Sequence, residues 1–174
     1  MNIFYLDENP MLAAQYQCDR HVVKMILESA QMLSTAQHKL CQTVSTELYK
    51  PTHINHPSAV WVRQSRDHYN WLCQHWLMLM SEYTARYGKT HKCDSLKQHL
   101  CIPIPASYFP QTGFTPPPQC MPEKYKQQDT VAAYRAYYIG EKSRFAKWNH
   151  GPTPDWYSAG LDNYWTATTL ENAA

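Results

Sequence analysis

Polar side chains recur along residues 17–35 at the spacing of one face of an α-helix. Successive members are four, three, four, three and four positions apart, and they are Gln17, His21, Lys24, Glu28, Gln31 and Thr35. The residues between them are mostly apolar, so the predicted helix has only a narrow polar face, which we call the polar seam. A helix of this kind is expected to be buried on most sides, with the seam lining a cleft.

The polar seam contains the groups needed for acid/base or amine chemistry at a buried site. A desolvated Lys24 amine could act as a nucleophile, whereas Glu28 one turn later could keep that amine charged and suited to phosphate. His21 faces the same line and belongs to the residue type that titrates near neutrality. The alternative interpretation is a surface helix in which the Lys24–Glu28 pair contributes only a few tenths of a kcal/mol.

Length and composition favour one folded domain spanning residues 1–174. Apolar residues make up 44% of the chain and charged residues only 17%, which argues against disorder. The net charge of +2 produces no strong overall attraction to nucleic acid, so any basic surface has to be local.

The six cysteines form no CxxC pair and show no zinc-finger spacing. Cys18 and Cys73 fall inside predicted helices, where buried thiols are common. Residues 1–10 lack the features of a signal peptide, and no apolar run reaches the length of a membrane span. We therefore expect a reduced, cytoplasmic protein with no membrane association, no metal and no cofactor.

Helical periodicity predicts an all-α fold. Long helices are expected over residues 10–40, 57–87 and 129–148, with a shorter one near 91–100. Asn9 can cap the first of these, because Pro follows it at the first helical position.

Residues 103–122 contain seven prolines and cannot form a helix or a central strand. We expect an extended proline-rich strap across the surface, fastened by Tyr108, Phe109 and Phe114. The chain then ends in an aromatic C-terminal tail, about residues 150–174. The predicted architecture is a single domain of three long helices, the strap and the tail.

Residues 52–57 (THINHP) precede the second long helix and permit three interpretations. Two histidines three positions apart could bind a metal. Asn55 or His56 could instead satisfy free backbone N–H groups at the helix entry. The helix N-terminus could also hold phosphate, and Arg63 and Arg66 follow within three turns.

Basic and aromatic residues alternate near the C-terminal end of the chain. Cations that bind phosphate beside aromatic rings that stack on bases are typical of a nucleic-acid surface, although aromatic residues at helical spacing more often form core. The residues concerned are Arg135, Lys142, Arg144, Lys147, Trp148, His150, Trp156 and Tyr157.

These features together resemble the pyrimidine-dimer DNA glycosylase family of the phage endonuclease V type, including its bacterial branch. Residues 49–63, with Asn55-His56-Pro57 and then Arg63, are similar to the bacterial members. Residues 68–88 are similar to the second helix of the phage enzyme, and 147–157 to its aromatic terminus. The resemblance spans about two thirds of the chain, which is also similar to uncharacterised proteins of tailed phages.

The resemblance implies attack by an N-terminal α-amine on the deoxyribose C1′ of a damaged pyrimidine nucleotide that has been flipped out of duplex DNA. A glutamate of the first helix would stabilise the sugar cation, and a Schiff base would permit strand cleavage. The chain departs from the family in two ways. It starts Met1-Asn2, without the family's small second residue, and the family's Arg-Glu pair falls near Lys24, with Glu28 one turn later.

Our first hypothesis is therefore a DNA glycosylase/AP lyase in which Lys24 or the Met1 amine is the nucleophile. Glu28 would be its electrostatic or acid/base partner, and His21 a proton carrier. The expected DNA-binding residues are Asn55, His56, Arg63, Arg66, Arg135, Lys147 and Trp156. The alternatives are a non-catalytic phage module that binds DNA or a protein, and an enzyme that modifies a nucleotide in the same cleft.

Overall fold

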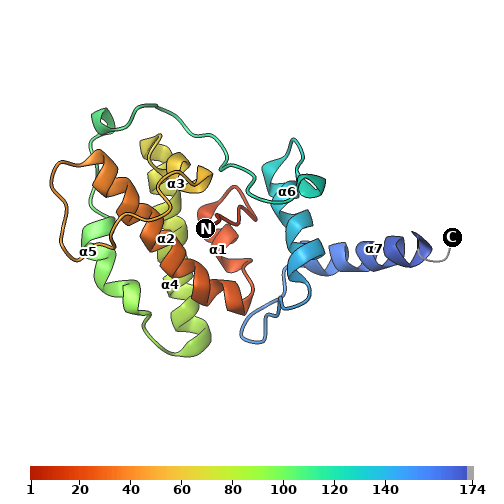
Figure 1. Cartoon of the computed structure of the whole chain (residues 1–174). Helices are drawn as coiled ribbons and strands as arrows, with labels where there is room; N and C mark the ends of the chain where they lie inside the picture. Colours follow the sequence, from red (N-terminus) through yellow and green to blue (C-terminus); the bar gives the residue numbers. More distant parts are fainter. Residues whose placement is uncertain (172–174) are drawn as a thin grey trace.

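All regular structure in the described part of the chain is helical (Figure 1). The computed structural model describes the backbone of residues 1–171 and the side chains of residues 1–164. The α-helices are α1 (Pro10–Gln15), α2 (Asp19–Leu40), α3 (Pro57–Val62), α4 (Arg66–Tyr87), α5 (Lys97–Leu100), α6 (Thr130–Tyr137) and α7 (Asp155–Glu171). The all-α prediction is confirmed. Within the described residues, no helix is both long and apolar enough to cross a membrane.

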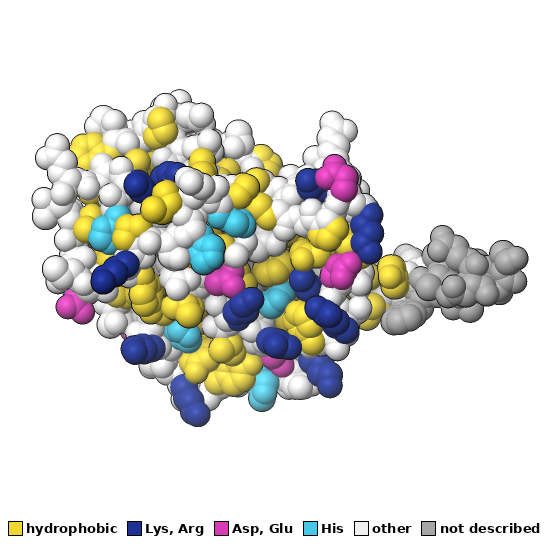
Figure 2. All heavy atoms as spheres, viewed as in Figure 1, with side chains coloured by type: hydrophobic (Ala, Val, Ile, Leu, Met, Phe, Trp, Pro, Cys, Tyr) yellow, Lys and Arg dark blue, Asp and Glu magenta, His cyan; other side chains and the backbone are white. Residues whose placement is uncertain are grey.

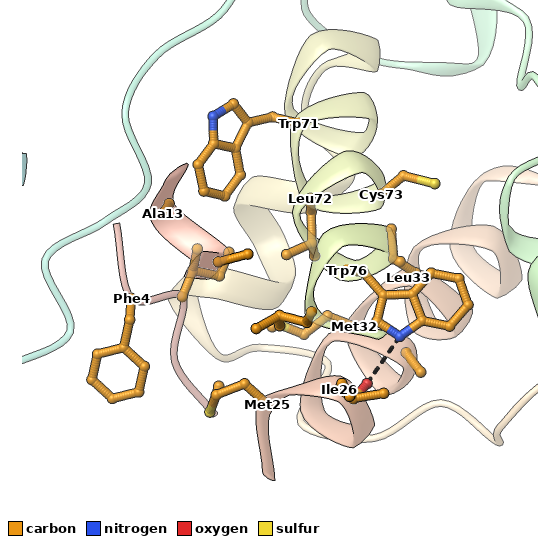
Figure 3. Packing of buried hydrophobic residues seen from close by; sticks show 14 of the residues in the cluster. Phe4, Ala13, Met25, Ile26, Met32, Leu33, Trp71, Leu72, Cys73 and Trp76 are labelled. Atoms are coloured by element: carbon orange, nitrogen blue, oxygen red, sulfur yellow. Dashed lines mark hydrogen bonds between the residues drawn. The ribbon is translucent and has the colours of Figure 1, made fainter. Parts of the chain in front are cut away.

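The core lies between α2, α4 and the N-terminal residues (Figure 3). Trp76 of α4 is fully buried, and its indole N–H donates to the Ile26 carbonyl of α2 across 3.1 Å. Apolar residues recur on α2 and α4 at helical spacing, so each helix buries one face against the other. The lead-in Ile3–Leu6 is buried beside them, which holds the chain's first residues against α2.

The first long helix, predicted over 10–40, is interrupted between α1 and α2. Tertiary partners satisfy the backbone groups that the break leaves free. The Arg86 guanidinium donates to the carbonyls of Gln15 and Gln17 at 2.9 Å each, and the Cys18 N–H donates to the Tyr138 hydroxyl at 3.0 Å. Gln17 therefore lies in the break and not on the helical seam.

The second predicted helix, 57–87, is divided in the same way at Arg63–Ser65. Ser65 caps α4, since its hydroxyl accepts from the Asp67 N–H and donates to the Gly113 carbonyl. His56 caps α3 by accepting from the Ser58 N–H at 3.2 Å. The polar helix-entry interpretation of residues 52–57 is therefore the correct one for His56.

The C-terminal part of the chain differs most from its prediction. The helix expected over 129–148 ends much earlier, because α6 passes into a π-helical turn at Tyr138–Lys142. The predicted aromatic tail begins instead with a turn and then forms α7, which extends from the body (Figure 1). Residues 172–174 of that tail lie outside the described residues.

The proline-rich strap runs from α5 to α6 along the upper edge of the molecule in Figure 1. The indole N–H of Trp61 donates to the Thr115 carbonyl, and the Thr115 N–H donates to His68 Nε2. Phe109 is buried, but Tyr108 is half exposed. Tyr108 was therefore wrongly predicted to fasten the strap, whereas Phe114 packs against the rings of Trp61 and His68.

Candidate active site

A cleft of about 570 Å³ opens between the start of the chain, α2 and residues 137–145. Its size is within the usual range of small-ligand sites. The lining residues are Met1, Asn2, Phe4, Arg20, His21, Lys24, Met25, Glu28, Tyr137, Lys142, Arg144 and Phe145. His21, Lys24 and Glu28 of the predicted seam lie in one wall, whereas Gln17, Gln31 and Thr35 are not among the lining residues, and the segment that follows α6 supplies the other wall.

The α-amino group of Met1 lies beside the Glu28 carboxylate, at 3.9 Å from Oε2. The Asn2 N–H donates to the same oxygen across 3.3 Å. Lys24 approaches the other oxygen, with Nζ 3.2 Å from Oε1. Glu28 is largely buried, at 16% exposure, so one carboxylate is shared by an α-amine and a lysine ammonium.

Tertiary contacts keep the start of the chain in place. The Asn2 side-chain amide donates to the Cys120 carbonyl across 3.0 Å, and the Tyr134 hydroxyl lies 2.8 Å from Asn2 Oδ1. The Met1 side chain is only 3% exposed. The amine is consequently fixed between α2, the strap and α6, and side chains that are held in this way are preorganised for chemistry.

The cleft has a strongly cationic rim. Arg20, Lys24, Lys142 and Arg144 line it together with the α-amine, whereas Glu28 is the only acid among the lining residues. Figure 2 shows Lys and Arg side chains gathered on this face of the molecule. Clustered positive charge in a recess favours an anionic ligand such as a phosphate group, even though the net charge of the chain is only +2.

His21 forms part of the cleft wall, where it is held as a neutral imidazole. Its ring stacks on Phe4 with centroids 4.3 Å apart, and Nδ1 lies 2.7 Å from the Tyr138 hydroxyl. Burial lowers the pKa of His21 to about 3, and the charges of Lys142 and Lys24 act in the same direction. Our expectation that His21 titrates near neutrality is therefore wrong.

The Tyr138 hydroxyl connects His21 to the start of α2. It accepts from the Cys18 N–H at 3.0 Å and can donate to His21 Nδ1 or accept from it, according to the tautomer of the imidazole. In either tautomer the neutral ring keeps one N–H donor and one acceptor and adds no positive charge to the cleft.

Most of the predicted DNA-binding residues are not at this cleft. Arg63 donates to the carbonyls of Ile54 and Ala59, and it therefore supports a turn. Arg66 lines a separate pocket beside Cys73.

The remaining predicted residues are also dispersed. Arg135 donates to the Leu6 carbonyl and lies over the Trp156 ring, so both take part in internal packing. Asn55 and Lys147 are exposed away from the cleft lining. His56 faces a neighbouring groove that shares Tyr137 with the cleft.

Sequence reasoning missed Arg20, although a signal was present. Arg20, Lys24 and Glu28 are each four residues apart, which places them on one helical face. Lys142 and Arg144 belong to the basic and aromatic interleave, but nothing in the sequence showed that they would face α2. Among the described residues, no group of three or more His, Cys, Asp and Glu side chains is arranged to hold a metal ion.

Comparison with known families gives a match to the first part of the chain. A family model described as pyrimidine dimer DNA glycosylase matches residues 1–95, which is 95 of the 174 residues. The chain belongs to the pyrimidine dimer DNA glycosylase family. Comparison with curated proteins and with solved structures returns no match. The resemblance noted from the sequence is therefore confirmed at the level of the family.

The matched region of this pyrimidine dimer DNA glycosylase family member contains one wall of the cleft. Met1, Lys24 and Glu28 all fall within residues 1–95. The opposite wall, with Lys142 and Arg144, lies beyond the match. The family assignment thus covers the amine and the carboxylate, while the second wall is described by the structure alone.

Proposed function

We propose that this protein is a DNA glycosylase with AP-lyase activity, which removes a damaged pyrimidine from duplex DNA and then cleaves the strand. The observation that carries the proposal is the α-amino group of Met1 beside the buried Glu28 carboxylate in a cationic cleft. Family membership supports a DNA substrate. Because a duplex hides C1′ within the stacked strand, the target nucleotide has to be flipped out to reach the amine.

The proposed reaction starts with the amine unprotonated. Its nitrogen forms a bond to C1′ as the bond from C1′ to the pyrimidine nitrogen breaks, and the base leaves with the electron pair and takes up a proton. The C1′–O4′ bond then opens, O4′ is protonated, and the secondary amine loses its proton to give a Schiff base. Loss of a C2′ proton finally expels the 3′ phosphate by breaking the C3′–O bond.

Glu28 has two roles in this scheme. Its carboxylate balances the positive charge that develops on the sugar as the base departs. It also lies close enough to the α-amine to accept a proton after a small side-chain movement, since the present separation is 3.9 Å. A carboxylate that is largely buried interacts with such a charge more strongly than one in bulk water.

We assign the nucleophile to the Met1 amine rather than to Lys24. The Met1 side chain is 3% exposed, whereas that of Lys24 is 64% exposed, with its ammonium 3.2 Å from Glu28 Oε1. If Met1 were removed, the nitrogen of Asn2 would become the amine, and it already lies 3.3 Å from Glu28 Oε2.

The remaining lining groups hold the substrate. Arg20 and Arg144 on opposite walls can each bind a backbone phosphate beside the flipped nucleotide. In the tautomer with its proton on Nε2, His21 can donate to a sugar or phosphate oxygen. The proton-carrier role first given to His21 is replaced here by a positioning role, because the imidazole is neutral.

Borohydride trapping on a duplex with an abasic site tests the proposal, because borohydride reduces a Schiff base to a stable covalent adduct. The wild-type protein should be trapped, and mass mapping should place the adduct on its N-terminal residue. Acetylation of the α-amine should abolish trapping, whereas Lys24→Ala should retain it. Lys39→Ala, at an exposed lysine near the far end of α2, is the matched control.

Two outcomes would contradict the proposal. An adduct on Lys24 would reassign the nucleophile within the same cleft. Absence of any adduct, on abasic and on dimer-containing duplexes, would leave a protein that binds DNA without amine chemistry.

A further inference from the structure

Two cysteines that are distant in the sequence meet on the surface away from the cleft. Cys73 lies in α4, and Cys101 is the residue that ends α5. Their sulfur atoms are 3.0 Å apart. Both line a shallow pocket that shares no residue with the candidate active site. The other four cysteines, all in the described part of the chain, make no sulfur–sulfur contact.

We propose that Cys73 and Cys101 form an oxidisable dithiol, a modification site at which a small-molecule disulfide such as oxidised glutathione produces an intramolecular disulfide. The inference is independent of the proposed glycosylase function. It rests on the sulfur–sulfur contact and on the unequal exposure of the two thiols, since Cys101 is exposed and Cys73 is 8% exposed.

The environment gives the two thiols different roles. The hydrogen bond between the two sulfurs lowers the pKa of Cys101 and raises that of Cys73. The positive charge of Lys97 further favours the Cys101 thiolate. An accessible thiolate is the form that attacks a disulfide, so Cys101 is the attacking thiol and Cys73 the resolving thiol.

The exchange proceeds in two balanced steps. The Cys101 thiolate attacks one sulfur of oxidised glutathione, which breaks the S–S bond, forms a mixed disulfide and releases one glutathione thiolate. Cys73 then loses its proton and attacks the Cys101 sulfur, which releases the second glutathione. The two protein thiols have lost two electrons, one glutathione disulfide has become two thiols, and the two protons end on glutathione.

The reduced structure already holds the two segments together. The Tyr69 hydroxyl of α4 donates to the Leu100 carbonyl at 2.8 Å, and the Gln37 amide of α2 donates to the His99 carbonyl at 2.8 Å. A disulfide requires a sulfur separation of about 2.05 Å, so the sulfurs need to approach by roughly 1 Å. Rotation of the exposed Cys101 side chain can supply most of this movement.

A disulfide here would close the chain from residue 73 to residue 101 and restrict the unfolded state. By the usual loop-length dependence and the size of the chain, oxidation should raise the melting temperature by about 7–14 °C. The candidate active site should be unaffected, because neither cysteine lines that cleft.

The test exposes the full-length protein to oxidised glutathione, removes the reagent and identifies the products by intact mass and peptide mapping. Wild type should lose two hydrogens, gain no glutathione and yield one disulfide-linked peptide pair containing residues 73 and 101. Cys73→Ser should retain one glutathione on Cys101, because no resolving thiol is present. Cys101→Ser should neither form the disulfide nor retain glutathione. Cys41→Ser changes a partly buried cysteine elsewhere and is the matched control, which should behave as wild type.

Cys101→Ser changes an exposed side chain, so it keeps the test valid even if Cys73→Ser fails to fold. The melting temperature of wild type, but not of Cys101→Ser, should rise after oxidation. The proposal is overturned if wild type keeps glutathione as a stable mixed disulfide, if a disulfide forms between other cysteines, or if no thiol reacts under conditions that oxidise free dithiothreitol.

Discussion

Acidification should destabilise the fold through two buried imidazoles. His21 lies in the cleft wall and His75 lies inside the core, where its ring stacks on Trp71 at 5.2 Å. Burial lowers the pKa of each from the ordinary value of 6.5 to about 3. Both are therefore neutral in the folded protein at pH 5, whereas in the unfolded chain they are mostly protonated.

The sign of the effect follows from this difference. Above pH 6.5 both states are neutral, and the two histidines impose no pH dependence on stability. As the pH falls from 6.5 towards 3, protons bind preferentially to the unfolded chain, which lowers the free energy of unfolding. With pKa values of 6.5 and about 3, each histidine costs about 2 kcal/mol at pH 5, or about 4 kcal/mol together.

Urea unfolding followed by circular dichroism at pH 7, 6 and 5 measures this loss. Burial also lowers the pKa of His56, His68 and His91, so the wild-type loss should be at least about 4 kcal/mol. His75→Gln retains an acceptor for the Gln17 amide, which lies 3.0 Å from His75 Nε2. This variant should recover about half of the loss from the two histidines, or about 2 kcal/mol between pH 7 and pH 5.

His150 is exposed, so His150→Gln is the matched control. It should leave the pH dependence of the free energy of unfolding as in wild type. A wild-type loss below about 1 kcal/mol between pH 7 and pH 5 would refute the reasoning. An unaltered pH dependence in His75→Gln would show that His75 is not held neutral by its burial.

Three further predictions concern the site and its support. Glu28→Gln should slow base release by about 10²-fold or more while substrate binding persists, since an amide cannot balance the developing charge. Single-turnover kinetics on a dimer-containing duplex measure this rate, and an unchanged rate would rule out the role given to Glu28. In titrations of a duplex, the double variant Arg20→Ala/Arg144→Ala should reduce the slope of log binding constant against log salt concentration by roughly 1.8, because two phosphate contacts are lost. Arg66→Ala, which lies outside the cleft, should leave this slope unchanged. Arg86→Met should lower the free energy of unfolding, measured by urea unfolding, by about 3 kcal/mol, because Asp19 and two carbonyls of the α1–α2 break lose their buried partner. A loss under about 1 kcal/mol would mean that the break is stable without Arg86.

Much of the local structure could be predicted because its causes are local. Apolar spacing within 19–40 and 66–87 specifies helices wherever a partner surface exists, and the prolines of 103–122 exclude an α-helix, leaving only one 3-10 turn at Ala106–Tyr108. Helix boundaries were harder to predict. Nothing in the sequence near Ser65 distinguishes it from a polar residue inside a helix. Its role at the boundary depends on the hydrogen bond to the Gly113 carbonyl, which is distant in the sequence.

The candidate site was predictable only in part. Lys24 and Glu28 share a helical face, and that relation is visible in the sequence. The position of the Met1 amine beside Glu28 depends on Asn2, which contacts Cys120 and Tyr134 more than a hundred residues away. Arg63 was predicted to bind DNA because a cation near a helix entry is a common phosphate ligand. In the structure its guanidinium donates instead to two nearby backbone carbonyls.

Helices over 19–40 and 66–87, and the shared helical face of Lys24 and Glu28, could be predicted from the sequence, whereas α7 and the early end of α6 could not. The side chains that face a cleft, the residues opposite them and their charge states depend on the tertiary structure. Periodicity records neighbours within one turn of helix, whereas a site depends on contacts between distant segments. His21 illustrates the difference, since burial against Phe4 and Tyr138 lowers the pKa of its imidazole to about 3.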